Sequence, residues 1–365
     1  MGFDEFKEKF VEDVKERITD KGLTADLRTV EKVNETYEAL SVTPEGGNIG
    51  MNLNIDRFYS SYEDGVDYDD LVNNAMDVID RGLNNIPDLD VNKFTDYEQM
   101  KDKLVMEVVS AETNAAILAT VPHKNMEDMA IVYRFMLDSH NGEQASVLVT
   151  NTVIAQMGIT PEQLHKDALK NAPEVKPLVI QGMSEVMAEM LGPDQAELMG
   201  IMPVAPEDEQ MYVASVPDKT HGASVIAYQD FMDKASERAG GDFFILPSSI
   251  HEILIIPDNK EIDFKVLEGM VRDVNETQVA PEDKLTDNVY HYDSRNKVFE
   301  LAEKFFERQN EIDSQEMEVD KDIEEPVTEK KSILAQLKAG REEEAAIKPK
   351  EAPIKDAKVK SGEAR

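Results

Sequence analysis

The side chains most capable of chemistry are concentrated in one short stretch, Pro247-Ser248-Ser249-Ile250-His251-Glu252, between two apolar runs. Serine, histidine and glutamate are the residue types of a nucleophile, a general base and an orienting carboxylate. On an extended strand, neighbouring side chains point to opposite faces, so Ser249 and His251 share a side that Glu252 does not. We therefore expect the serines to bind turn amides and His251 to pair across a sheet. A hydrolase site built on Ser249, His251 and Glu252 is the alternative.

Residues that commonly hold metals or cofactors form no recognised motif. The six histidines are scattered along the chain, and none forms the His-Glu-x-x-His pair of a zinc protease. They are His123, His140, His165, His221, His251 and His291. The chain has no cysteine, which excludes disulfides, thiolate zinc sites, iron-sulfur clusters and cysteine nucleophiles. Phosphate-binding glycine loops and the Gly-x-Ser-x-Gly elbow are also absent from the sequence. We expect no cofactor and no metal site.

Two polar positions lie within apolar runs. Arg134 follows Tyr133 in a stretch of Ile, Val, Phe and Met, and such a cation needs a carboxylate partner or a solvent-facing edge. Tyr290-His291-Tyr292 is typical of a half-buried strand rather than of an active site. Both positions therefore predict structural contacts more than catalysis.

Charge excludes a further class of function. The 365 residues contain 39 basic and 75 acidic side chains, so the net charge is 39 − 75 = −36. Nucleic-acid affinity rests largely on Lys and Arg, so generic binding to DNA or RNA is disfavoured. The acidic N-terminus does not resemble a signal peptide, and no apolar run is long enough to cross a membrane. These features predict a cytoplasmic protein with no membrane partner.

The spacing of apolar residues predicts an α+β fold with mostly antiparallel sheet and packed helices. Helices are predicted at 3–18, 67–83, 113–120, 184–191, 229–239, 263–275 and 298–307. A three-stranded antiparallel meander is predicted over 25–33, 37–43 and 48–55, with further strands at 103–110, 127–138, 145–150, 210–215, 224–228, 243–246, 250–256 and 289–292. Thr160-Pro161-Glu162-Gln163 supplies an N-cap, a proline at N1 and a glutamine at N3, which predicts a helix start. Segments 145–149 and 223–227 resemble each other and suggest two strand-helix units.

The segment from 173 to 206 is rich in methionine and proline. Methionine side chains adapt to many shapes, so this segment is either a pliable binding surface or ordinary core. The sequence favours core. We expect an N-terminal lobe over 1–200 and a C-terminal lobe over 201–308, with one continuous domain over both as the alternative.

From residue 309 onward aromatic residues vanish, and the composition predicts a disordered charged tail. Residues 309–329 carry nine acids and one base, and residues 330–365 carry six acids and ten bases, so the tail runs from −8 to +4. The tail sums to −4, and the folded body therefore carries −36 + 4 = −32. Ile333, Leu334 and Leu337 form a short helical stripe within 332–338 that could fold upon a partner.

Several segments together resemble an uncharacterised family of bacterial proteins of unknown function. They include Asn114-Ala115-Ala116-Ile117-Leu118, Met129-Ala130-Ile131-Val132-Tyr133-Arg134, Gly158-Ile159-Thr160-Pro161-Glu162-Gln163-Leu164 and Pro247-Ser248-Ser249-Ile250-His251-Glu252. The resemblance covers about 3–292, and members of that family often occur near mobile genetic elements. It implies a bacterial cytoplasmic protein with an accessory role, and it brings no activity, cofactor or catalytic residue.

The sequence therefore favours a non-enzymatic accessory or protein-interaction module, with an unknown protein as its partner. One alternative is an acidic mimic of nucleic acid that occupies a DNA-binding protein, since the body is strongly negative. The other is a hydrolase that uses Ser249 and His251, or a metal enzyme built from scattered histidines and carboxylates. In the mimic, acidic side chains would form rows on one face. In the hydrolase, His251 would lie in a concave pocket within hydrogen-bond reach of a serine and a carboxylate.

Overall fold

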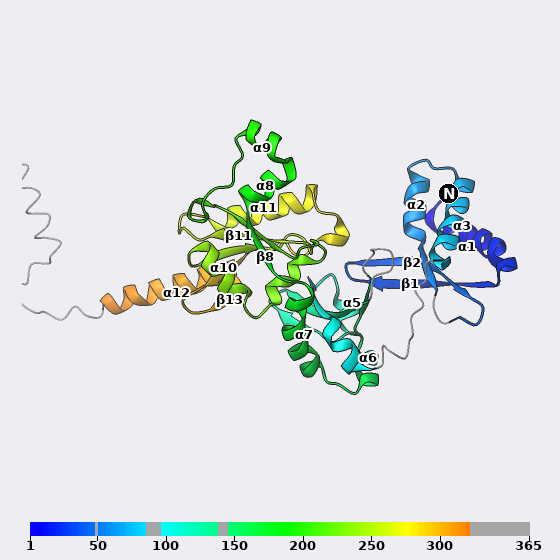
Figure 1. Cartoon of the computed structure of the whole chain (residues 1–365), viewed down its shortest axis with the longest axis horizontal. Coiled ribbons are helices and arrows are strands. Elements are labelled where there is room, and N and C mark those ends of the chain that lie inside the picture. The colour runs from blue at the N-terminus through cyan, green and yellow to red at the C-terminus, as the bar shows by residue number, and fades with distance from the viewer. Residues whose placement is uncertain (48–49, 85–95, 138–144, 322–365) are drawn as a thin grey trace, which may run out of the picture. The chain divides into compact units, whose positions relative to one another are not determined.

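The first part of the chain forms an antiparallel sheet covered by helices. The computed structural model describes residues 1–47, 50–84, 96–137 and 145–321, without the side chains of 207 and 313–321. Strands β1 (Leu23–Lys32), β2 (Glu35–Pro44) and β3 (Met51–Asn54) pair in that order, as the predicted meander requires. Helices α1 (Phe3–Ile18), α2 (Ile55–Glu63) and α3 (Tyr68–Asn84) pack on it, and η1 (Thr19–Lys21) is a single 3-10 turn (Figure 1). Helix α2 is not among the predicted elements.

The apolar stripe of α1 explains its packing. Phe6, Phe10, Val14 and Ile18 recur at helical spacing and are buried, while the charged residues between them are mostly exposed. They join Leu40, Val42 and Leu53 of the sheet in one core cluster. This helix is confirmed with the bounds that its sequence predicts.

A second sheet has four strands. Strand β4 (Leu104–Ser110) pairs with β6 (Met129–Met136), and β6 also pairs with β5 (Lys124–Met126) and β7 (Ser146–Leu148). The helical elements of this region are α4 (Tyr97–Met100), η3 (Lys101–Lys103), α5 (Ala115–Leu118), α6 (Asn151–Met157) and α7 (Pro161–Val175). Helix α7 begins as predicted, because the Thr160 hydroxyl accepts the Gln163 N–H at 3.2 Å. Its buried residues pack against one face of the sheet.

The third sheet has six antiparallel strands in the order β13-β12-β10-β11-β9-β8. Their bounds are β8 (Val179–Gly182), β9 (Tyr212–Ser215), β10 (Phe243–Leu246), β11 (Ile253–Pro257), β12 (Tyr290–Asp293) and β13 (Val298–Leu301). Strand β10 is buried on both faces: Phe243 and Ile245 belong to the main core, and Phe244 and Leu246 to a second cluster beneath α11 (Phe264–Thr277) and α12 (Ala302–Lys321). A strand that is buried on both faces needs apolar side chains at every position, which explains the run Phe243–Leu246.

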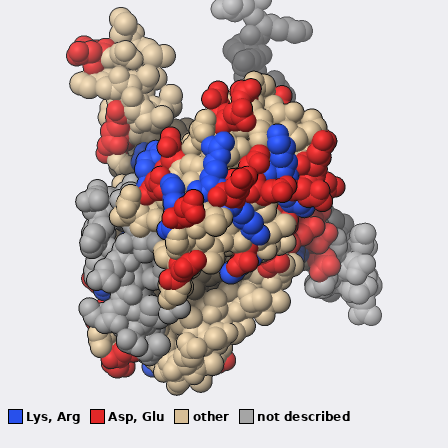
Figure 2. All heavy atoms as spheres, turned by 90° about the vertical axis from the view of Figure 1, so that its right-hand side faces the viewer, with Lys and Arg blue, Asp and Glu red and all other residues tan. Residues whose placement is uncertain are grey.

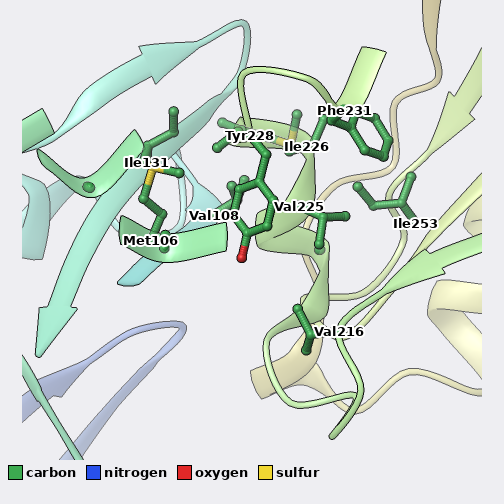
Figure 3. Packing of buried hydrophobic residues seen from close by; sticks show 14 of the residues in the cluster. Met106, Val108, Ile131, Val216, Val225, Ile226, Tyr228, Phe231 and Ile253 are labelled. Carbon is green, nitrogen blue, oxygen red and sulfur yellow. The ribbon is translucent and has the colours of Figure 1, made fainter. Parts of the chain in front are cut away.

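The segment 224–228, predicted as a strand, is instead the 3-10 helix η5 (Gly222–Ala227). All six of its residues are buried. Figure 3 shows Val225 and Ile226 near Met106 and Val108 of the four-stranded sheet, with Ile253 of the six-stranded sheet close by. Apolar composition marked the burial correctly, but a run this short cannot distinguish a strand from a buried helical turn. The suggested repeat of 145–149 and 223–227 is therefore wrong, because 146–148 is a strand and 222–227 is a 3-10 helix.

The prediction that the Met-rich stretch is core is also wrong. Helix α8 (Met183–Leu191) is confirmed and is followed by a second short helix, α9 (Pro193–Met199), and most of their large apolar side chains are exposed. The predicted helix 298–307 is wrong in its first four residues, which form strand β13, and α12 begins only at Ala302. The remaining described elements are η4 (Pro206–Asp208), α10 (Phe231–Ala239) and η6 (Pro281–Asp283).

Residues 1–308 form one compact unit. Strands β8 and β9, which come from either side of residue 200, are neighbours in one sheet. The α+β class with antiparallel sheets and packed helices is confirmed. Within the described residues, no helix combines the length and apolarity that a membrane span needs.

Candidate functional site

Strand alternation places Glu107 and Arg134 on the same face of the four-stranded sheet. Met106 and Val108 of β4 face the main core, so Glu107 between them faces the other way. On β6, Tyr133 and its alternate neighbours face that core, which turns Arg134 to the side of Glu107.

The register pairs Glu107 with Val132 and Val105 with Arg134, so the two charged residues are diagonal neighbours across the ladder. Arg134 Nη1 donates to Glu107 Oε2 at 3.1 Å, and Arg134 Nε donates to Ser146 Oγ at 2.9 Å. Of the two alternatives that the sequence left for Arg134, a carboxylate partner or a solvent-facing edge, the structure shows the carboxylate.

The environment keeps Glu107 ionised. Burial of the side chain, the largest influence, raises its pKa, but the adjacent His221 and the Arg134 guanidinium together outweigh it and hold the pKa below its ordinary value. Glu107 is therefore a buried carboxylate that is charged at neutral pH. Such a group is stable only while its partners remain in place.

His221 reaches the same carboxylate from a distant part of the chain. Its Nδ1 lies 2.8 Å from Glu107 Oε1, an ion-pair distance, yet neither atom has an aligned hydrogen-bond partner among the described residues. The backbone of His221 is left-handed, with φ of 54°, which is uncommon for a residue other than glycine. The surrounding structure holds it there: Gly222 follows, packed so closely that a Cβ would overlap Ser215 Oγ and the His251 carbonyl oxygen.

His251 lies beside His221, with the ring centroids 5.9 Å apart. Its Nδ1 accepts the His221 backbone N–H at 3.4 Å, and its Nε2 lies 3.2 Å from Asp283 Oδ1, an ion-pair distance. Both ring nitrogens are thereby used in contacts within the protein.

Ser249 does not act on the imidazole of His251 in this geometry. The Ser249 hydroxyl accepts the backbone N–H of His251 at 2.9 Å, which is the turn role that its position suggested. Glu252 is half-buried, and no hydrogen bond or ion pair joins its carboxylate to His251 among the described residues. His251 does have a carboxylate partner, Asp283, but it comes from a different segment than the sequence suggested.

A cavity of 380 Å³ opens beside these groups. Its polar lining includes Glu107, Arg134, His221 and Asp283, and its apolar lining is Val33, Ile117, Leu148 and Ile250. Glu31, Lys32 and Glu282 complete it. The residues come from the first hairpin, the four-stranded sheet, helix α5 and the loops around η5 and η6, so only the folded chain assembles this site.

The tip of the β1–β2 hairpin is tied down next to the cavity. Asn34 and Asn114 exchange two hydrogen bonds, at 2.7 Å from the Asn34 N–H and at 2.6 Å from the Asn114 amide. The Asn34 amide also donates to the carbonyl oxygens of Glu282 and Lys284. Asn34 is left-handed, with φ of 60°, a conformation that asparagine tolerates better than most residues.

Replacing Asn34 by alanine is expected to lower the free energy of unfolding by about 2 kcal/mol, since the three hydrogen bonds of the side chain are lost and alanine is strained at this φ. Asn34→Gly removes the same side chain without the strain, so it should be the milder change. Urea unfolding of the two variants checks the order. Equal stability of Asn34→Ala and the unaltered protein would show that these hydrogen bonds of Asn34 do not stabilise the hairpin tip.

One other set of potential ligands converges in the described residues. Asp242, Asp258 and His291 place one ligand atom each within 4.8 Å of one another. The Lys260 ammonium already contacts both carboxylates, at 3.1 Å and 2.7 Å. Burial raises the pKa of Asp258, but His291 and Lys260 outweigh it and hold that pKa well below the usual range. Lys260 thus supplies the positive charge that a metal would bring. Tyr290-His291-Tyr292 lies in strand β12 as predicted, but the strand is fully buried and not half-buried, because β12 is an inner strand of the sheet.

A second feature is a group of exposed apolar side chains on α8, on α9 and on the chain that follows them. The two helices come directly after edge strand β8 (Figure 1). We call Met187, Met190, Leu198, Met199, Met202 and Val204 the methionine surface. Met190 is 79% exposed and Leu198 is 87% exposed. The predicted binding residues Ile333, Leu334 and Leu337 lie outside the described residues.

The methionine surface is held by a short polar contact at the start of α8. The Glu209 carboxylate accepts the Ser184 hydroxyl at 2.6 Å and the Ser184 N–H at 3.3 Å. The Ser184 hydroxyl in turn accepts the N–H of Val204 at 3.2 Å, which ties the returning chain to the helix. Gly192 and Gly200 end the two helices with positive φ angles of 75° and 70°.

Comparison with known proteins gives one match. A family model described as "Family of unknown function (DUF5688)" matches residues 3–294, and the chain belongs to this family. No curated protein and no solved structure matches the chain.

Proposed function

We propose that this member of the DUF5688 family is a protein-interaction module that binds a basic amphipathic helix of a partner protein on the methionine surface. The observation that carries the proposal is the exposure of six large apolar side chains within one short segment. Scattered exposed apolar residues are normal on a folded protein, but several in one segment are typical of an interaction site.

Methionine suits such a surface. Its unbranched, polarisable side chain adapts to the shape of a partner and is frequent where one surface binds several sequences. The two helices are short and joined at Gly192, and their buried residues are Val186 and Ala196 alone. A partner helix would cover apolar area that the rest of the described chain leaves open.

Charge around the surface determines which partner fits. From 177 to 218 the chain contains no Lys, Arg or His but eight acidic residues, among them Glu185, Glu189, Asp194 and Glu197 on the two helices. An apolar surface with acidic flanks attracts a helix with an apolar stripe and basic flanks, because complementary charge speeds encounter and disfavours acidic partners.

The acidic-mimic hypothesis receives less support. On the face shown in Figure 2, Lys and Arg lie among Asp and Glu rather than beside an unbroken acidic row. Several acidic side chains of the described chain are paired with lysine, such as Asp80 with Lys21 at 2.8 Å and Glu38 with Lys7 at 3.7 Å. Mixed charges of this kind favour solubility over imitation of a phosphate backbone.

The proposal is tested with a synthetic helical peptide that has leucine on one face and lysine on the other. We expect it to bind the full chain, and we expect Met190→Glu and Leu198→Glu each to weaken binding about tenfold or more, since each removes a buried apolar contact and adds a charge. Calorimetric titration measures the affinities. A peptide with glutamate in place of lysine should not bind.

The matched control is Val266→Glu on α11, because Val266 is also exposed and the change adds the same charge elsewhere. If all three variants bind the lysine peptide alike, the methionine surface is not the site. The tail residues Ile333, Leu334 and Leu337 remain a separate proposed contact. Deletion of 330–365 should change the partners recovered by cross-linking, and an unchanged set would remove the tail from the proposal.

A further inference from the structure

Strand β1 forms a long free edge of the three-stranded sheet. It pairs with β2 along all ten of its residues without a bulge, and no described strand lies on its other side (Figure 1). Among the described residues, no group forms a hydrogen bond with the outer backbone groups of β1. Proline, bulges and short length usually protect such an edge from pairing, and β1 has none of these.

The register shows which backbone groups of β1 point outward. The turn between β1 and β2 has two residues, so the flanking pair of Lys32 and Glu35 exchanges hydrogen bonds, and so does every second pair after it. The Glu38 N–H agrees with this, since it donates to Asp56 Oδ2 at 2.9 Å and so turns away from Thr29, its neighbour on β1. The outward N–H and C=O groups therefore belong to Leu23, Ala25, Leu27, Thr29 and Glu31.

The side chains in the middle of β1 are complementary to themselves. Leu27 is 44% exposed, although it lies opposite the buried Leu40 on the sheet face that the helices cover. Asp26 and Arg28 flank Leu27 on the other face of the strand. Both are exposed, and Asp26 Oδ2 lies 4.0 Å from Arg28 Nη2. The centre of the edge thus presents an apolar side chain between two opposite charges.

A second β1 placed antiparallel and centred on Leu27 matches these groups. Leu27 would lie opposite Leu27, and Asp26 of each copy would lie opposite Arg28 of the other. The outward backbone groups would meet as hydrogen-bonded pairs, Leu27 with Leu27 and Ala25 with Thr29. A centre one residue earlier or later would place Asp26 opposite Asp26 or Arg28 opposite Arg28, and like charges in such pairs are unfavourable. Charge therefore selects both the partner and the register.

We propose that two copies of this chain form a dimer by antiparallel pairing of their β1 edges, centred on Leu27. The pairing joins the two three-stranded sheets into one continuous sheet. It uses the same edge of both copies, so the assembly closes at two. The contact is separate from the methionine surface, and neither proposal depends on the other.

Sedimentation velocity of the full chain over a range of concentrations gives the first test. We expect the unaltered chain to form a dimer. Leu27→Pro should raise the dissociation constant about tenfold or more, because proline removes an outward N–H but leaves every hydrogen bond to β2 in place. Circular dichroism checks that this variant folds.

A change of charge tests the register without altering the backbone. Asp26→Arg should raise the dissociation constant about tenfold or more, since it places arginine opposite arginine twice. The double variant Asp26→Arg with Arg28→Asp has the opposite charges in reversed order, so it should form the dimer again. Glu237→Arg, which changes an exposed acid on α10 in the same way, is the matched control and should dimerise as the unaltered chain does.

Amide hydrogen exchange locates the contact. In the dimer, the amides of Ala25, Leu27 and Thr29 should exchange more slowly than in Asp26→Arg, whereas that of Val30, which points to β2, should be protected in both. The proposal is overturned if the unaltered chain is monomeric at high micromolar concentration, which would leave the edge to an extended segment of another protein. It is also overturned if either single variant of β1 dimerises like the unaltered chain, or if the double variant folds but stays monomeric.

Discussion

Gly222→Ala is expected to lower the free energy of unfolding by about 3 kcal/mol or more. The new Cβ would overlap the Ser215 hydroxyl, which can rotate, and the His251 carbonyl oxygen, which belongs to the backbone and cannot. The same hydroxyl donates to that carbonyl at 2.7 Å, so relief of the overlap breaks this bond. Urea unfolding followed by circular dichroism gives the change.

Gly269→Ala is the matched control. Gly269 lies inside α11, and a Cβ there would meet nothing within 4 Å. Alanine is favoured over glycine in a helix interior, so this variant should be more stable by about 0.5–1 kcal/mol. The same substitution thus has opposite signs at the two sites. A Gly222→Ala protein as stable as the unaltered one would show that the loop before η5 is not as tightly packed as the structure indicates.

Arg134→Met is expected to destabilise the fold by about 3–5 kcal/mol, because it leaves the Glu107 carboxylate buried without its guanidinium partner. The double variant Arg134→Met with Glu107→Leu should recover most of that loss, since an apolar pair of similar size avoids the desolvation of both charges. A double-mutant cycle measured at neutral pH gives the coupling free energy. Near-additive effects would contradict the pairing.

The pH dependence has a defined sign. The pKa of Glu107 is lowered in the folded protein, so its ionised form stabilises the fold. This contribution is fully present above the ordinary glutamate pKa and is lost as the pH falls through the lowered folded value. In Arg134→Met the folded pKa should rise, and less stability should then be lost on acidification. A steeper acid loss in the variant than in the unaltered chain would contradict this assignment.

Many elements of the fold could be predicted from local sequence patterns. Helix α1 has its predicted bounds because its apolar residues repeat at helical spacing along sixteen residues, long enough for the period to be unambiguous. The start of α7 followed from the residue types at Thr160 and Pro161, whose roles are local to one turn. The apolar neighbours of Arg134 predicted either a carboxylate partner or a solvent-facing edge, and the structure shows the carboxylate of Glu107.

The candidate site could not be found in the same way. Glu107 lies in an apolar run and has no motif around it, and His221 is one of six scattered histidines. The alternation of β4, together with its register on β6, gives Glu107 and Arg134 a common face. A signal was present in Glu107 itself, the one charged residue in Leu104–Ser110, which predicts either a partner or a solvent-facing edge.

The sequence by itself determined the α+β class, the acidic charge, the absence of cysteine chemistry and most helices and strands, because composition and short-range periodicity are properties of neighbouring residues. Only the tertiary structure decided that 222–227 is a 3-10 turn, that His251 pairs with Asp283 rather than Ser249, and that the methionines are exposed. These outcomes depend on which surfaces remain for a segment after the sheets have packed. Such surfaces are supplied by residues far away in the chain, and no local pattern records them.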